Sequence, residues 1–130
     1  MKRSLIAFIG VLCLAGSYSG QAIRPDQPET VMVTFRPKPG SEMELARVIA
    51  NHWKTASELK LVSPTPHLTL RGTDESKRTY FVEIFTWRDS SIPDSAPPAI
   101  QKIWAEMNAL VESRGVGQPG LNFTEVSVIK

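Results

Sequence analysis

Glu83 stands in an apolar segment where a carboxylate is unexpected. Alternate residues of a strand share a face, so Glu83 is expected beside Phe81, Phe85 and Trp87. An unpaired carboxylate among aromatic side chains is costly in free energy. Two explanations stay open: an ion pair, with Arg71 or with a basic residue of a partner chain, or a role as an acid or base in a pocket.

His52 is the second candidate for chemistry. At about 100° per residue, the helix predicted over 41–61 places His52 between Leu59 and Leu45 on its apolar stripe. Such a histidine either bonds a backbone carbonyl in the core, or acts as a general base or haem ligand between helices and sheet. His67 begins a predicted strand and is expected to be exposed.

The predicted site has two catalytic candidates and a set of ligand-binding candidates. The catalytic candidates are His52 and Glu83. The ligand-binding candidates are Trp53, Trp87, Trp104, Phe85 and Arg71. The tryptophans have a second interpretation as core and interface residues. The chain has only two histidines and no H-x-H or H-E-x-x-H spacing, so no metal and no other cofactor is predicted.

The elements that must position these residues follow the order β-α-β-β-α-β. Strands are predicted over 31–36, 67–71, 79–87 and 123–129, and helices over 41–61 and from 94–98 through 111. This is the split β-α-β pattern of the ferredoxin-like α+β fold. That fold is a four-stranded antiparallel sheet with two helices on one face.

Local signals set the ends of the first helix. Ser41 and Glu44 form a capping box at its start, and Pro64 and Pro66 close it.

The strand 79–87 is apolar on both faces, although an antiparallel strand with one face in water should alternate. The sheet is therefore expected to form a homodimer through the face that the helices leave open.

Several of these segments resemble a known family. Pro39 and Gly40 before the first helix, the strand 81–89 and the helix that contains Trp104 resemble the dimeric α/β barrel superfamily, in particular its antibiotic-biosynthesis-monooxygenase-like branch. The resemblance implies a dimeric barrel and, for enzymes of the branch, cofactor-free oxygenation of quinol-type substrates or haem degradation. The chain has Phe85 where members commonly have an acid, and no histidine in its second helix, so their catalytic residues are not carried over.

Residues 1–22 are predicted to be a cleavable signal peptide. Two basic residues precede an uncharged apolar run over 5–15, which is shorter than the roughly 20 residues of a membrane-spanning helix. Cleavage is expected after Ala22, with cleavage after Ser19 as the second choice. The resulting protein is expected to be exported, periplasmic or secreted, without a stable membrane anchor.

Removal of the signal changes the composition of the protein. An extended leader is predicted over 23–30 and a single domain over 31–130. Cys13 is the only cysteine, so the mature chain has no disulfide and no thiolate ligand. Loss of Lys2 and Arg3 from the 15 basic residues leaves as many basic residues as the 13 acidic ones. No cluster of Lys or Arg favours nucleic acid as a partner.

Three functions remain open on the sequence. The leading prediction is an exported protein that binds a small apolar or aromatic molecule between helices and sheet, with or without catalysis. The alternative is a cofactor-independent monooxygenase acting on a phenolic or quinol substrate, with His52 or Glu83 as proton acceptor. The third is a structural or interaction module that has no ligand.

Overall fold

The computed structural model describes residues 27–130, so the predicted signal peptide and the first part of the leader lie outside it. The predicted order of elements is confirmed. The elements are β1 (Glu29–Phe35), α2 (Glu42–Glu58), β2 (Val62–Thr73), β3 (Thr79–Trp87), the 3-10 turn η1 (Ile92–Ser95), α3 (Pro98–Ala109) and β4 (Leu121–Glu125). No helix in this part of the chain is long and apolar enough to cross a membrane.

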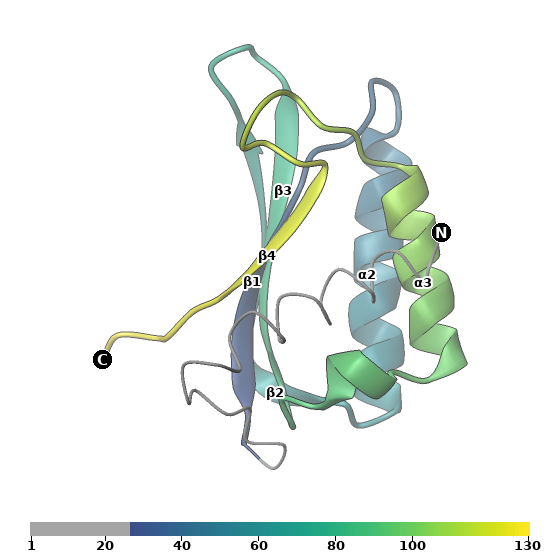
Figure 1. The fold of residues 1–130 in the computed structure, drawn as a ribbon, viewed down its shortest axis with the longest axis vertical. Coiled ribbons are helices and arrows are strands. Elements are labelled where there is room, and N and C mark those ends of the chain that lie inside the picture. Colours follow the sequence, from purple (N-terminus) through teal and green to yellow (C-terminus); the bar gives the residue numbers. More distant parts are fainter. Residues whose placement is uncertain (1–26) are drawn as a thin grey trace.

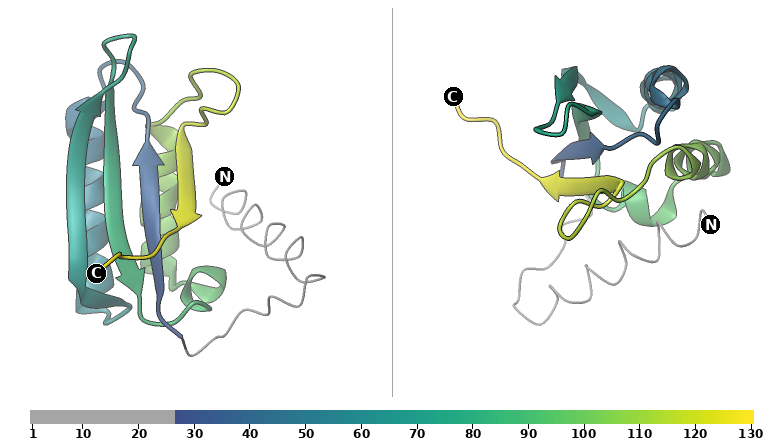
Figure 2. Two further views of the ribbon diagram at one scale, coloured as in Figure 1. Left: turned by 90° about the vertical axis from the view of Figure 1, so that its left-hand side faces the viewer. Right: turned by 90° about the horizontal axis from the view of Figure 1, so that it is seen from above.

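The four strands form one antiparallel sheet in the order β2-β3-β1-β4. Helices α2 and α3 lie side by side on one face of the sheet (Figures 1 and 2). The other face carries none of the helices or strands of residues 27–130, and the residues after β4 leave the body on that side (Figure 1). The predicted ferredoxin-like α+β fold is therefore confirmed.

The core lies between the helices and the sheet, and alternation along β3 explains its composition. Phe81, Glu83, Phe85 and Trp87 are all buried on the helix side. The main contributions from the helices are Leu45 and Ile49 of α2 and Ile100, Ile103 and Met107 of α3. Burial of these apolar side chains is the main term that stabilises such a fold.

The open face of the sheet is also apolar. In the strand register, Ile84 lies between Met32 of β1 and Leu68 of β2. Leu70 pairs with Val82 in the neighbouring row. Leu68 is 52% exposed and Leu70 is 49% exposed. The predicted apolar character of both faces of β3 is confirmed. Met32 of β1 and Leu68 and Leu70 of β2 add apolar side chains to the open face.

Several predicted boundaries are wrong. Helix α2 ends at Glu58, and β2 begins at Val62 and continues through the two prolines that were expected only to end the helix. Proline is tolerated there because β2 is an edge strand with a register shift between Val62 and His67. The predicted capping box is absent, since the side chain of Ser41 makes no cap hydrogen bond.

The last two elements also differ from prediction. Helix α3 starts at Pro98, four residues later than Asp94, because Ala96 and Pro97 each precede a proline and adopt extended ψ angles of 144° and 156°. Strand β4 runs over Leu121–Glu125, earlier and shorter than the predicted 123–129. It ends beside the beginning of β1. The N–H of Val126, directly after β4, donates to the carbonyl oxygen of Thr30, the second residue of β1.

Candidate functional site

The carboxylate of Glu83 lies between two imidazoles. Its Oε2 is 3.2 Å from Nε2 of His67, and its Oε1 is 3.7 Å from Nδ1 of His52. Glu83 has no exposed surface and His52 is only 3% exposed. The three residues come from three elements, since His52 is on α2, His67 on β2 and Glu83 on β3.

The strand register explains why His67 reaches Glu83. His67 is opposite Phe85, and Thr69 is opposite Glu83. Residues two apart on one strand share a face, so His67 is the diagonal neighbour of Glu83 on the helix side of the sheet. His52 approaches the carboxylate of Glu83 from α2, because it is one of the four buried residues of that helix.

Aromatic side chains surround His52. Phe85 and Trp87 meet its imidazole edge to face, with ring centroids at 5.6 Å and 6.1 Å. Trp104 of α3 donates its indole N–H to Nε2 of His52 at 3.1 Å. The surroundings are therefore apolar except for this bond and Glu83, and electrostatic interactions inside such a site are stronger than in water.

The other end of the site is in contact with solvent. The side chain of His67 is 25% exposed, and Trp53 of α2 stacks on it with ring centroids 3.7 Å apart and 6° between the planes. Trp53 is itself half-buried. The stacked pair thus forms the accessible end of the site, and His67 connects it to Glu83.

Two buried polar atoms of the site have no hydrogen-bond partner. They are Nδ1 of His52 and Oε1 of Glu83. The 3.7 Å between them is too long for a hydrogen bond. Unsatisfied buried groups are uncommon in folded proteins, so this facing pair of polar atoms requires an explanation.

The structure brings together most of the predicted site residues. His52, Glu83, Trp53, Phe85, Trp87 and Trp104 form one connected group. Arg71 does not join it: Arg71 is exposed and lies opposite Phe81, and in the described part of the chain the ion pairs of Glu83 are with the two histidines. The expected ion pair between Arg71 and Glu83 is therefore wrong.

His67 is the site residue that the sequence interpretation missed. It was expected to be an exposed strand end, whereas it contacts Glu83 and Trp53. The available signal was the alternation of β2, which places His67, Thr69 and Arg71 on one face. Pro64 and Pro66 obscure that signal, because prolines at this spacing after a helix favour the end of the helix over a strand. The expectation that a core His52 bonds a backbone carbonyl is also wrong, since its partner is the indole of Trp104.

No group of three or more His, Cys, Asp or Glu side chains among residues 27–130 is arranged to hold a metal ion. In the Glu83 cluster, each histidine directs at least one ring nitrogen at a protein group: Nε2 of His52 at Trp104, and Nε2 of His67 at Glu83. The chemistry available to these side chains as they stand is hydrogen bonding and proton transfer.

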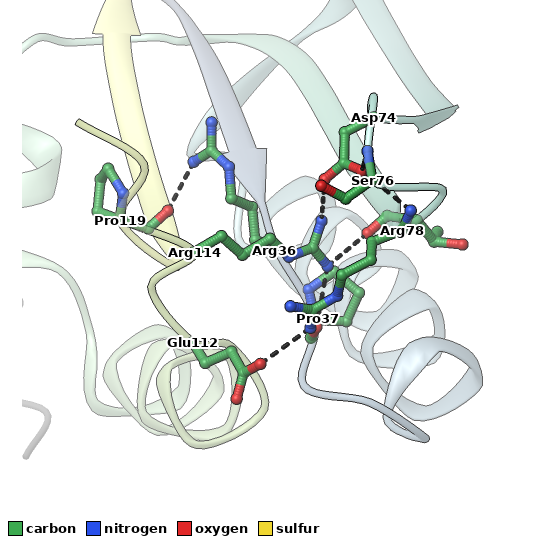
Figure 3. Close-up of polar contacts among 9 residues, drawn as sticks. Arg36, Pro37, Asp74, Ser76, Arg78, Glu112, Arg114 and Pro119 are labelled. Atoms are coloured by element: carbon green, nitrogen blue, oxygen red, sulfur yellow. Dashed lines mark hydrogen bonds and ion pairs between the residues drawn. The ribbon is translucent and has the colours of Figure 1, made fainter. Parts of the chain in front are cut away.

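A second polar cluster lies around the β2–β3 hairpin and the chain after α3 (Figure 3). Its centre is Arg114, which donates to Oδ2 of Asp74 at 3.0 Å and to the carbonyl oxygens of Thr79 and Pro37 at 2.7 Å and 3.1 Å. Asp74 also accepts the backbone N–H groups inside its own hairpin. The side-chain partners of Arg114 lie in the β2–β3 hairpin, at the first residue of β3 and in the loop after β1, so this cluster links the chain after α3 to these segments.

Solved structures of similar fold give the chain its context. SnoaB, a cofactor-independent oxygenase from Streptomyces nogalater solved as a single-residue variant, matches with a TM-score of 0.58 and 18% identity over 80% of this chain and 95% of that chain. An antibiotic biosynthesis monooxygenase matches with a TM-score of 0.55 and 13% identity over 78% and 98%. Rv0793 from Mycobacterium tuberculosis matches with a TM-score of 0.54 and 14% identity over 80% and 97%.

The chain has the ferredoxin-like fold of antibiotic biosynthesis monooxygenases. The ferredoxin-like fold implied by the family resemblance is thereby confirmed, whereas the dimeric barrel stays a prediction. No protein-family model matches the sequence, and no curated protein sequence matches it.

Proposed function

We propose that this chain is an exported protein that binds a small hydroxylated aromatic molecule at the Glu83 site and takes its hydroxyl proton on Glu83. The observation that carries this proposal is Oε1 of Glu83, a fully buried carboxylate oxygen that has no hydrogen-bond partner and faces Nδ1 of His52 at 3.7 Å. A hydrogen-bond donor would stabilise a carboxylate oxygen in such surroundings, because a buried acceptor without a partner costs about 1–3 kcal/mol in free energy.

The chemistry around Glu83 defines the ligand class. Phe85, Trp87 and Trp104 favour an aromatic ring, since edge-to-face contacts between rings add to the burial of apolar area. Oε1 of Glu83 favours a group that donates a hydrogen bond. A phenol or naphthol meets both requirements, and we propose that it enters at the solvent end, beside Trp53 and His67.

Proton transfer follows from the same contact. The O–H bond of the ligand breaks, its proton passes to Oε1 of Glu83, and the electron pair stays on the ligand as a phenolate. A positioned base of this kind contributes about 10²–10⁴ to a rate. The phenolate is the form that reacts with dioxygen.

A second candidate function adds turnover to binding. A phenol and dioxygen give a para-quinone and water, so that one oxygen atom enters the ring, the other leaves as water, and the substrate supplies the electrons. The shared fold with SnoaB, described as a cofactor-independent oxygenase, supports this candidate. Oxygen consumption in the presence of a bound phenol separates it from binding alone.

The test of the binding proposal compares matched ligands on the mature chain. 1-Naphthol is expected to raise the thermal unfolding midpoint, because a ligand at 100 times its Kd stabilises the folded state by about 2.7 kcal/mol. 1-Methoxynaphthalene, which has no hydroxyl to donate, is expected to stabilise much less. In Glu83→Leu, which has no acceptor at this position, the preference for the hydroxyl is expected to disappear. Equal stabilisation by both compounds in the unaltered protein would contradict the proposal.

Export and dimerisation are the remaining parts of the proposal. The apolar run over 5–15 and the small residues near Ala22 support cleavage of a signal peptide. The intact mass of protein from the envelope or medium is expected to correspond to a chain that begins near Ile23.

The open apolar face with Ile84, Leu68 and Leu70 supports a homodimer, because contiguous apolar patches of this kind commonly mark interfaces.

A further inference from the structure

We infer that Trp104 is a positioning residue, which holds His52 in the tautomer that carries its proton on Nδ1. The inference about the tautomer stands on the contacts of His52 alone. Its meaning for a ligand rests on the proposed function. In this arrangement one histidine is a fixed hydrogen-bond donor beside Glu83.

The first step is the direction of the bond between Trp104 and His52. The indole N–H is a donor and has no acceptor lone pair. It lies 3.1 Å from Nε2 of His52. Nε2 must therefore offer its lone pair, and the proton of a neutral imidazole must be on Nδ1. A second proton on Nε2 would place two N–H groups against each other.

The second step is burial. Trp104 is 6% exposed and His52 is 3% exposed, so bulk water does not compete for either ring. Turning the imidazole over would place a C–H group where Nε2 now accepts, and the buried indole N–H would lose its partner. Loss of a partner by a buried donor costs about 1–3 kcal/mol, which is enough to select one ring orientation and one tautomer.

The third step is the contrast with His67. His67 directs Nε2 at Oε2 of Glu83, whereas His52 directs Nδ1 at Oε1. Where Oε2 of Glu83 acts as the acceptor of this hydrogen bond, the N–H of His67 is on Nε2. The two histidines of the site are therefore held with their protons on opposite ring nitrogens, facing the same carboxylate.

This assignment separates the roles within the proposed site. His52 has no free lone pair, because Nε2 is occupied by Trp104 and Nδ1 carries the proton. The expectation that His52 serves as proton acceptor is thus replaced by a role as donor. A ligand hydroxyl would give its proton to Oε1 of Glu83 while its oxygen accepts from Nδ1–H of His52.

Nitrogen NMR of the mature chain without a polyhistidine tag tests the inference. The sequence contains only two histidines, so ¹⁵N-histidine labelling gives two rings, and His67→Gln assigns them. For His52 we expect Nε2 at the far-downfield position of an unprotonated nitrogen and Nδ1 at the position of a protonated one. For His67 we expect a protonated Nε2. A protonated Nε2 on His52 in the unaltered protein would overturn the inference.

Variants then identify the residue responsible. Trp104→Phe keeps an aromatic ring but removes the donor, and is expected to convert the single tautomer of His52 into a mixture. Trp87→Phe is the matched control, since Trp87 meets the same imidazole edge to face, and it is expected to leave the tautomer unchanged. An unchanged tautomer in folded Trp104→Phe would refute the role of Trp104. If that variant does not fold, the spectrum of the unaltered protein still decides the tautomer.

The outcome is independent of ligand binding. Failure of every hydroxylated aromatic compound to stabilise the protein would remove the proposed function and leave the tautomer result standing. The opposite tautomer combined with selective binding of 1-naphthol would refute this inference and leave the proposed function in place.

Discussion

Trp53 lies flat on His67, with ring centroids 3.7 Å apart and 6° between the ring planes. The pair joins α2 to the edge strand β2 at the end of the Glu83 site where the side chain of His67 is exposed to solvent. Stacking holds the imidazole of His67 in the plane from which its Nε2 reaches Glu83. Trp53 therefore orients a residue of the site without touching the carboxylate.

Removal of this stack should be measurable as a coupling between the two residues. In a double-mutant cycle of Trp53→Ala and His67→Ala, we expect a coupling free energy of about 0.5–1.5 kcal/mol, the size typical of aromatic pairs. Urea unfolding of the four proteins measures it. Trp53→Phe should keep part of the coupling. A coupling near zero would mean that the stack contributes nothing to the orientation of His67.

Truncation of Glu83 should destabilise the protein strongly. Glu83→Ala leaves a cavity and removes the acceptor that faces His52 and His67, and we expect it to cost more than about 2 kcal/mol in the free energy of unfolding. Glu83→Gln fills the same space and should cost less. Glu44→Ala, on the exposed side of α2, is the control and should stay within about 0.5 kcal/mol of the unaltered protein. Similar values for all three variants would show that burial of Glu83 has no energetic consequence.

Much of the fold was predictable because it depends on local patterns. The helical stripe of α2 and the alternation of β3 follow directly from residue spacing, and both place His52 and Glu83 on buried faces. The contact between them was not predictable, because it depends on how α2 crosses the sheet. His67 was harder still, since two prolines that commonly end a helix here lie inside an edge strand.

The open face of the sheet gives a prediction about assembly. Replacing Leu68 and Leu70 by lysine places two charges on the proposed interface and should convert a dimer into a monomer, because desolvation of unpaired charges is costly. Sedimentation equilibrium measures the change. Leu59→Lys is the matched control, since Leu59 is 45% exposed but lies at the end of α2, away from this face. Loss of the dimer in both proteins, or in neither, would exclude the sheet face as the specific interface.

The hairpin residue Asp74 gives a prediction about pH. The backbone N–H of Arg78, followed by that of Ser76 and the guanidinium of Arg114, holds the pKa of Asp74 below its ordinary value of 3.8 despite the opposing effect of desolvation. A lowered carboxyl pKa stabilises the folded protein above the ordinary pKa, and this contribution is lost as the pH falls through the folded-state value. Asp74→Asn should therefore lower the unfolding midpoint at pH 7.

The difference between Asp74→Asn and the unaltered protein should shrink as the pH is lowered below about 4, where the carboxyl of the unfolded chain is already protonated. Thermal unfolding across that range checks it. Glu75→Gln changes the exposed neighbouring residue and should show no such dependence. A difference that stays constant with pH would mean that Asp74 acts through its shape and not through its charge.

The first part of β2 has a further consequence for the whole sheet. It forms a free edge, and it carries Pro64 and Pro66 beside a shift in register against β3. Proline has no backbone N–H to donate to an added strand. In an irregular strand, the remaining N–H and C=O groups do not match the regular spacing of such a strand. Edge-to-edge pairing with another strand is therefore disfavoured along residues 62–67. The same stretch of chain that places His67 beside Glu83 is therefore a poor template for an added strand.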